Sequence, residues 1–319
     1  MRALFAIVLA VLGGAQETKP PGLVQTIPMP RVEGRIDHLA YDAKAGRLYV
    51  AALGNNSVEV IDLGAGKGIH SIDGLHEPQG ILFLEGRIVV ASGGDGSCRF
   101  YDGATFKLAG TVDCKDDADN VRYDPEAKLL YVGYGGGGLA VIDPEKGARV
   151  GAIPLEAHPE SFQLEWKGKR VFINVPKAGH IAVADREKRA VIATWKISAG
   201  SNFPMALDET GHRLFVGCRQ PAKLVVVDTD SGKERGSIDC SGDTDDVFYD
   251  AASKRVFVSC GAGFLDVFDA SDAPKRLARV ATAAGARTCL YLPDLGRIFL
   301  AVPHRGSQQA EIRVYGVRP

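Results

Sequence analysis

The sequence predicts an all-β fold, namely a single seven-bladed β-propeller made of four-stranded blades. The first observation is a short apolar run that ends in Asp, is followed by a turn, and recurs along almost the whole chain. Six copies end at Asp62, Asp102, Asp143, Asp185, Asp228 and Asp269. A seventh copy ends at Tyr315 instead, and successive copies lie 40 to 46 residues apart. Strand-forming repeats of roughly 40 residues are typical of propeller blades.

The second observation is that each repeat divides into four strand-sized pieces. In the third repeat they are residues 120–124, 129–133, 139–143 and 149–153, separated by turn residues such as Pro and Gly. The pieces are rich in β-branched and aromatic residues, as strands are. The second piece of every repeat carries an apolar triplet, found at residues 48–50, 88–90, 130–132, 171–173, 214–216, 256–258 and 298–300. Seven triplets predict seven blades.

The third observation concerns the two ends of the repeat array. The last repeat reaches the end of the chain without room for a fourth strand, whereas residues 23–27 form a strand-like run with no repeat of their own. We expect this N-terminal strand to complete the last blade and close the ring. Closure of this kind leaves no long sheet edge exposed. A closed array can be one domain at 319 residues, so residues 23–316 are predicted to form the propeller.

Residues 1–15 have the pattern of a signal peptide. A positive charge at Arg2 precedes an apolar run over residues 3–12, and small residues follow up to Ala15. This pattern predicts cleavage before Gln16, a short mature segment over residues 16–22, and a periplasmic or secreted location. An apolar run of this length is too short to span a bilayer. No other segment of the sequence is long and apolar enough, so we expect no membrane span.

The repeats also carry a family resemblance. The Arg-Leu-Tyr-Val run at residues 47–50, followed by residues 55–62, resembles the YVTN β-propeller repeat, as do residues 128–132 with 141–143. The chain is similar to YncE-like proteins of the YVTN and quinoprotein amine dehydrogenase-like group, within the WD40/YVTN repeat-like superfamily. The resemblance covers nearly all of residues 23–316. It implies the seven-bladed fold but no particular activity, because that group includes proteins of unknown role, surface-layer proteins and a few enzymes.

Charge and cysteine content exclude some classes of function. The net charge is −1 and the isoelectric point is about 6.7, so the basic footprint of a nucleic-acid-binding protein is absent. The six cysteines form no CxxC pair, which disfavours a zinc ribbon or a redox motif. In an exported chain they can form disulfides. Cys98 and Cys114, on neighbouring antiparallel strands, are the predicted pair, while the other four allow three connectivities or remain thiols.

The start of the first strand in each blade contributes one residue to a ring around the mouth of the central channel. By analogy with other propellers, ligands are expected on this face. The ring consists of Asp37, Gln79, Asp119, Glu160, Phe203, Asp245 and Arg287. The next position of each strand adds His38, Gly80, Asn120, Ser161, Pro204, Asp246 and Thr288. We predict ligand contacts from every polar or aromatic residue of the first ring and from His38, Asn120, Ser161 and Asp246.

Crowded carboxylates at the mouth favour a bound cation or captured protons. Oxygen ligands suit Ca²⁺ or Mg²⁺, and a set of His38, Asp119, Asp245 and Asp246 would also suit Zn²⁺ or Mn²⁺. The alternative is that these side chains bind only strand ends and channel water. His158, in the connection before the fourth blade, is expected to cap a turn or pack between blades.

The sequence therefore predicts an exported, monomeric binding or scaffold module that holds a small molecule or a protein at the channel mouth. The alternative is a metal-assisted lactonase, hydrolase or lyase, in which a carboxylate of the ring acts as general base. No GxSxG, HExxH or SxxK set is present, and no catalytic residue is assigned. The recurring Asp residues are predicted to cap turns on the opposite face.

Overall fold

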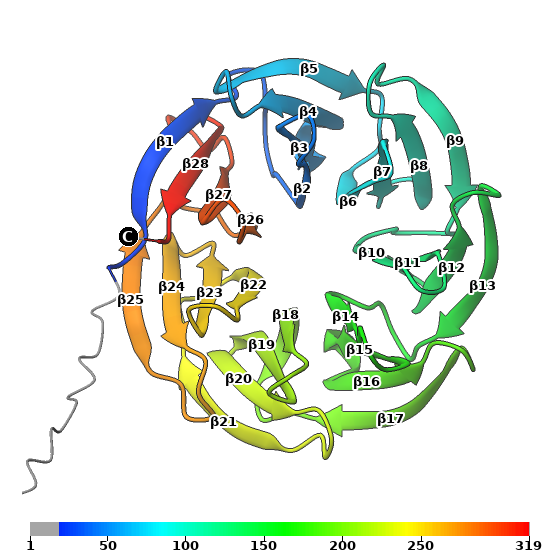
Figure 1. The fold of residues 1–319 in the computed structure, drawn as a ribbon, viewed down its shortest axis with the longest axis vertical. Coiled ribbons are helices and arrows are strands. Elements are labelled where there is room, and N and C mark those ends of the chain that lie inside the picture. Colours follow the sequence, from blue (N-terminus) through cyan, green and yellow to red (C-terminus); the bar gives the residue numbers. More distant parts are fainter. Residues whose placement is uncertain (1–18, 319) are drawn as a thin grey trace, which may run out of the picture.

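The computed structural model describes residues 19–318, and the predicted signal peptide over residues 1–15 lies outside them. Seven antiparallel four-stranded sheets are arranged around a central axis, as Figure 1 shows. The predicted seven-bladed propeller is confirmed. Within the described residues, no helix is long and apolar enough to cross a membrane.

Each of the first six blades is built from four strands that follow one another in the chain, the innermost first. Blade one consists of β2 (Leu39–Asp42), β3 (Arg47–Ala52), β4 (Ser57–Asp62) and β5 (Lys67–Asp73). Blade two consists of β6 (Pro78–Leu84), β7 (Arg87–Ser92), β8 (Ser97–Asp102) and β9 (Leu108–Asp113). Blade three consists of β10 (Val121–Asp124), β11 (Leu129–Tyr134), β12 (Gly138–Asp143) and β13 (Ala148–Pro154).

The next three blades repeat the arrangement. Blade four consists of β14 (Phe162–Leu164), β15 (Arg170–Val175), β16 (His180–Asp185) and β17 (Ala190–Lys196). Blade five consists of β18 (Gly200–Asp208), β19 (Arg213–Gln220), β20 (Ala222–Asp228) and β21 (Glu234–Asp239). Blade six consists of β22 (Thr244–Asp250), β23 (Arg255–Cys260), β24 (Phe264–Asp269) and β25 (Arg276–Ala281). Two single 3₁₀ turns, η1 (Leu53–Asn55) and η2 (Pro176–Ala178), lie between second and third strands.

The seventh blade is assembled from both ends of the described chain. It consists of β26 (Cys289–Leu292), β27 (Arg297–Val302), β28 (Glu311–Gly316) and, outermost, β1 (Gly22–Pro28). Strand β1 runs antiparallel to β28, and Ile27 lies opposite Ile312. In Figure 1 the blue first strand lies beside the red last one. The predicted closure by the N-terminal strand is confirmed.

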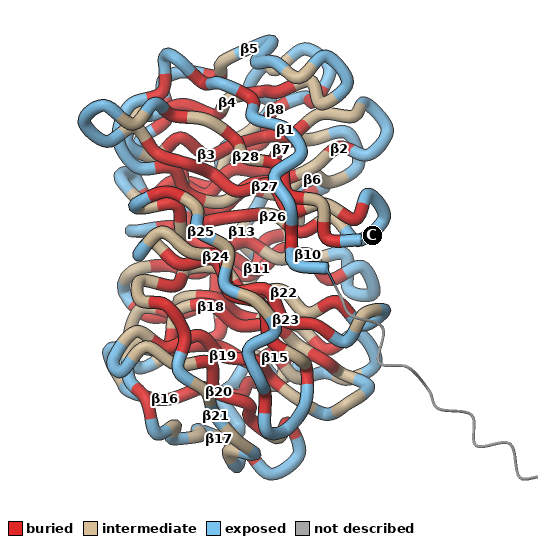
Figure 2. The backbone as a smooth tube through the Cα atoms, turned by 90° about the vertical axis from the view of Figure 1, so that its left-hand side faces the viewer, coloured by how far each residue is buried: buried red, intermediate tan, exposed pale blue. Residues whose placement is uncertain are grey.

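The core lies between blades rather than within any one of them. The apolar triplets of the second strands are fully buried, as at Leu48, Tyr49 and Val50. The outermost strands alternate between half-buried and exposed residues, as β21 does, because only one of their faces packs on the protein. Each hydrophobic cluster takes residues from neighbouring blades; one cluster joins Tyr49 of blade one to Ile88 of blade two. Figure 2 shows buried strands in the middle and exposed loops at both faces.

The recurring Asp residues stabilise turns, as the sequence predicts. The carboxylate of Asp62 accepts a hydrogen bond from the amide of Ala65 at 2.8 Å. Asp102 accepts one from Thr105 and Asp228 one from Ser231, both at 2.7 Å. These aspartates close the turn between the third and fourth strands and take no part in the channel mouth.

An arginine at the start of the second strand fastens several blades to the next one. Arg47 donates to the carbonyl of Gly103 at 3.1 Å, and Arg87 donates to that of Pro144 at 2.8 Å. Blade three has Leu129 at this position and so lacks this arginine. Here the link to the next blade comes from an arginine of blade four instead. Arg186 of blade four reaches back to the buried carboxylate of Asp124 in blade three, and it also donates to backbone carbonyls of its own blade.

The predicted disulfide is not formed in the structure, where all six cysteines are buried thiols. Cys98 lies opposite Val112, and the amide of Cys114 bonds to the carbonyl of Gly96. The two cysteines are therefore diagonal neighbours across β8 and β9 rather than a directly opposed pair. Their thiols are in contact, and the hydrogen bond to Cys114 together with burial raises the pKa of Cys98 well above its usual value.

Candidate binding site at the channel mouth

A cavity of about 410 Å³ lies at the mouth of the central channel, on the predicted face. Its lining comes from the connections between blades, from the ends of second strands, from η1 and η2, and from the starts of first strands. The lining residues are Arg35, Leu53, Glu77, Gln79, Asp117, Asp119, His158, Glu160, Lys177, Phe203, Arg219, Asp245 and Arg287.

The predicted contact residues divide between different places. Six line the mouth cavity, namely Gln79, Asp119, Glu160, Phe203, Asp245 and Arg287. Three line a second cavity deeper in the channel, namely His38, Ser161 and Asp246. Asp37 is buried beneath Arg35, whose guanidinium lies 2.8 Å from its carboxylate. Asn120 is buried and borders neither cavity.

Backbone hydrogen bonds fix the ring residues at their places. The amide of Asp119 bonds to the carbonyl of Gly133, and that of Glu160 bonds to Asn174. Arg35 is held by a close approach of η1, in which the amide of Gly54 bonds to the Arg35 carbonyl at 2.8 Å. A Cβ at Gly54 would lie only 2.7 Å from the Arg35 nitrogen. Glycine at this position therefore allows Arg35 to reach the mouth.

One side of the mouth is an ion-pair network from blades five to seven. Arg219 lies 2.6 Å from Asp245 and stacks over the ring of Phe203, with 3.6 Å to the ring centroid. Arg287 lies 2.9 Å from Asp243 and 3.2 Å from Asp245. Burial raises the pKa of Asp245 to about 6, against the opposing charge of Arg219. The carboxylates on this side have arginine partners.

The opposite side has carboxylates without arginine partners. Asp119 is 7% exposed, and its carboxylate lies 3.9 Å from the Nε2 atom of His158. The Nδ1 atom of the same ring lies 3.6 Å from Asp117. The carboxylate of Glu160 has neither a hydrogen bond nor an ion pair with any residue between 19 and 318. We call Asp119, His158 and Glu160 the acidic side of the mouth.

Electrostatics on the acidic side follow from burial and crowding. Burial, followed by the charge of Asp119, raises the pKa of Glu160 to about 8. Burial also acts to raise the pKa of Asp119, but the contact with His158 and the charge of His38 outweigh it and lower that pKa. Burial acts to lower the pKa of His158, and its carboxylate neighbours raise it overall. At neutral pH the acidic side therefore holds one proton on Glu160.

The geometry of possible metal ligands differs from the predicted set. Among the described residues, the one group of three such ligands whose atoms lie within 4.8 Å of one another is Asp119, His158 and Glu160. His38 lies instead between Asp246 at 3.6 Å and Asp37 at 3.7 Å. Burial acts to lower the pKa of His38, but these carboxylates raise it to about 10. Of the four predicted metal ligands, only Asp119 belongs to the group of three.

The sequence predicts a turn-capping or packing role for His158 and gives no role to Arg35. His158 lies two residues before Glu160, in the connection that leads into the fourth blade. This short spacing between a histidine and a ring carboxylate is the sequence feature that indicates a place for His158 at the mouth. For Arg35 the signal was its position two residues before Asp37.

The raised pKa of Glu160 predicts a pH dependence of stability. The carboxyl is protonated in the folded protein up to about pH 8, whereas in the unfolded chain it ionises near pH 4.3. The folded state then binds more protons between these values, so stability falls as the pH rises through this range. We expect the melting temperature of Glu160→Gln to fall less between pH 5 and pH 8 than that of the wild type. The exposed Glu187→Gln is the control, and equal slopes in all three proteins would contradict the pKa assignment.

Comparisons with known proteins identify the fold. No family model matches the chain, and no curated protein sequence matches it. A chain of the structure described as the mitotic checkpoint complex matches with a TM-score of 0.79 at 13% identity, covering 99% of this chain and 100% of that one. The RRP9 WD40 repeats match with a TM-score of 0.82 at 9% identity, covering 95% and 100%. Hydrazine synthase from Kuenenia stuttgartiensis matches with a TM-score of 0.76 at 14% identity, covering 95% and 99%.

These identities are low while the coverage is nearly complete, so the likeness is one of architecture. The chain is a seven-bladed β-propeller whose structural neighbours include WD40-repeat propellers.

Proposed function

We propose that this protein is a binding module that takes its ligand at the channel mouth through a positively charged group of that ligand. The observation that carries the proposal is the acidic side of the mouth, where Asp119 and Glu160 line the cavity without an arginine partner. A cation seated there would pair with Asp119 and would displace the proton that Glu160 holds at neutral pH. The arginines of the other side are already engaged with Asp243 and Asp245.

The size and lining of the mouth support a small ligand. A volume of about 410 Å³ falls within the usual range for small-molecule sites. Phe203 and Arg219 form a stacked platform at the cavity wall, and Lys177 adds a second cation. A molecule with a cationic group and a nearby anionic group would satisfy both sides of the mouth.

Location and family are part of the same proposal. The pattern of residues 1–15 supports export to the periplasm or the medium, and the repeats over residues 47–62 support a YVTN-type, YncE-like propeller. We propose that it acts as a monomer. In this setting the module would collect its ligand outside the cytoplasm.

A second candidate function rests on the same three residues. Asp119, His158 and Glu160 supply two carboxylates and one imidazole within 4.8 Å, a donor set that suits Zn²⁺ or Mn²⁺. A divalent ion there would act as a Lewis acid for a metal-assisted hydrolase, lactonase or lyase. These residues would hold the ion, and Asp117 beside His158 would orient the imidazole.

Calorimetric titration separates the two functions. We expect at least one organic cation from a set of putrescine, spermidine, agmatine and a lysine tripeptide to bind with one-to-one stoichiometry. Asp119→Asn is expected to weaken that binding at least tenfold, and the exposed Asp239→Asn is expected to leave it unchanged. Stoichiometric, tight binding of Zn²⁺ or Mn²⁺ that Asp119→Asn abolishes would instead establish the metal site. The proposal is wrong if neither organic cations nor divalent ions bind at millimolar concentration.

A further inference from the structure

A second cavity, of about 490 Å³, lies deeper along the central channel. Its lining shares no residue with the mouth cavity. It extends from His38 and Asp246, each one residue after a member of the mouth ring, to Tyr41 and Leu292 near the far ends of β2 and β26. We call this cavity the axial chamber.

The residues three positions after each member of the mouth ring form the middle of the axial chamber. Leu82, Phe248 and Leu290 give it an apolar wall, and Ala40 and Ala206 continue that wall. Gln163 is polar, but its amide is used, because it donates to the carbonyl of Met205 at 2.9 Å. Arg122 is the one charged residue in this ring of seven equivalent positions.

Arg122 has little to bind within the protein. Its Nη1 atom donates to the carbonyl of the preceding residue, Val121, at 2.8 Å. Its guanidinium lies 5.6 Å from the centroid of the Phe162 ring. It forms no ion pair with a carboxylate in the part of the chain that the structure describes. A guanidinium carries five N–H donors, so most of the donors of Arg122 remain free.

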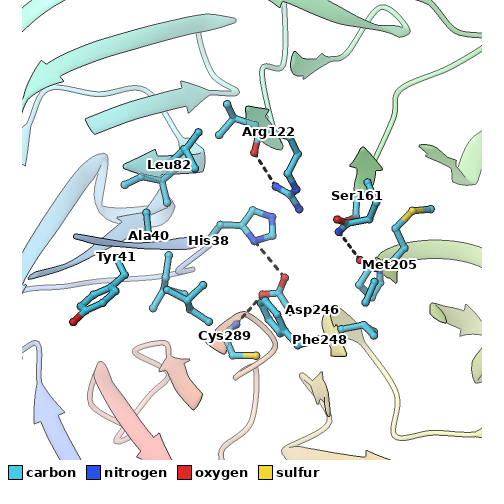
Figure 3. A pocket seen from close by; sticks show the side chains of 18 of the residues that line it. His38, Ala40, Tyr41, Leu82, Arg122, Ser161, Met205, Asp246, Phe248 and Cys289 are labelled. Atoms are coloured by element: carbon cyan, nitrogen blue, oxygen red, sulfur yellow. Dashed lines mark hydrogen bonds and ion pairs between the residues drawn. The ribbon is translucent and has the colours of Figure 1, made fainter. Parts of the chain in front are cut away.

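The nearest charged groups of the chamber are committed elsewhere. Asp246 lies 3.6 Å from the ring of His38 and accepts the backbone amide of Cys289 at 2.8 Å. Figure 3 shows the side chains of Arg122 and His38 extending towards the middle of the cavity, with Asp246 turned to His38. Burial lowers the pKa of Arg122, although Asp246 and Asp119 act against this. Arg122 is partly buried. A partly desolvated cation without an anionic partner is less stable than a paired one, and an anion bound beside it would supply that partner.

We propose that the axial chamber binds an amphipathic monocarboxylate, with the carboxylate held by Arg122 and the hydrocarbon chain packed along Leu82, Phe248 and Leu290. The planar fork of a guanidinium matches a carboxylate with two parallel hydrogen bonds. One free guanidinium in an otherwise uncharged and mostly apolar ring favours a ligand with a single negative charge on an apolar body. The chamber volume is in the range of small-molecule sites.

Calorimetry with octanoate at pH 7.5 tests the proposal on the purified full chain. We expect octanoate to bind with one-to-one stoichiometry. Octan-1-ol keeps the chain but lacks the charge, and acetate keeps the charge but lacks the chain, so each should bind at least tenfold more weakly. Octan-1-ol binding as tightly as octanoate, or no octanoate binding at millimolar concentration, would overturn the assignment.

Arg122→Leu locates the binding in the chamber, because leucine already occupies the equivalent positions 82 and 290. We expect this variant to bind octanoate at least tenfold more weakly and, without ligand, to melt at a higher temperature than the wild type. The exposed Arg31→Leu is the matched control and should do neither. Should Arg122→Leu fail to fold, Arg122→Gln gives the same readout. Unchanged octanoate binding in the folded variant would refute the proposal. The absence of cation binding at the mouth would contradict the proposed function but not this inference, because the two cavities share no residue.

Discussion

Replacing Ile27 with alanine is expected to lower the free energy of unfolding by about 2–5 kcal/mol, the usual cost of truncating a buried isoleucine. Ile27 is 0% exposed and lies opposite Ile312 in the pair of strands that closes the ring. Its side chain belongs to the cluster that also contains Met29 and Val32. The truncation removes packing where the first and last described strands meet, so it weakens the closure itself. The midpoint of urea unfolding measures the effect.

A matched control lies on the same strand. Leu23 is 55% exposed and pairs with Tyr315, so Leu23→Ala should change stability by no more than about 0.5 kcal/mol. Comparable effects of the two substitutions would mean that β1 does not close the seventh blade in solution. A large effect at Ile27 alone would show that closure depends on the buried side of this strand.

The fold could be predicted because its determinants are local and repeated. Six of the seven blades carry a turn-capping Asp such as Asp62, and every blade has a buried second strand such as residues 48–50, within one stretch of about 40 residues. Because the pattern occurs seven times, the strand assignment does not depend on any single repeat, in which the pattern can be weak. Closure followed from counting strands, because one run at residues 23–27 lacked a repeat and the last repeat lacked a strand.

The candidate site could be predicted only in outline. Position in the repeat identifies which residues begin a first strand, but not where their side chains point. β22 has a register shift between Thr244 and Asp246. Asp245 lines the mouth cavity, whereas Asp246 lines the axial chamber deeper in the channel. Two residues that the sequence suggested as one metal set therefore lie in different cavities.

Contacts between side chains of different inter-blade connections could not be predicted from the sequence either. His158 meets Asp117 and Asp119 because a loop of blade four leans over blade three, and no periodicity encodes that contact. Arg122 is different, because the sequence already shows one charge among mostly apolar residues at the seven positions that lie three residues after the mouth ring. In this fold, a residue that differs in type from its equivalents in the other blades is therefore a better indicator of a candidate site than a short sequence motif.

Replacing Arg186 with alanine is expected to cost about 3–5 kcal/mol, as for a buried ion pair that loses one partner. Both side chains of the pair are buried, with 8% and 7% of Arg186 and Asp124 exposed. The same guanidinium donates to the carbonyls of Glu165 and Gly168. Its loss would leave a buried carboxylate without its charge partner and would remove a hydrogen bond from each of the two carbonyls between blades three and four. Urea unfolding of the purified protein measures the change.

The double variant Asp124→Asn with Arg186→Ala distinguishes the lost charge pairing from lost packing. The other oxygen of Asp124 caps the turn to β11 by accepting the amide of Glu126 at 3.0 Å, and asparagine retains an oxygen for that bond. Because the double variant buries no charge, it should be less destabilised than the sum of the two single variants. Lys188→Ala, in a pair whose lysine is 73% exposed, should cost less than about 1 kcal/mol. Strict additivity of the two single effects would show that Arg186 acts by packing alone, and that the reversed link between blades three and four holds no charge coupling.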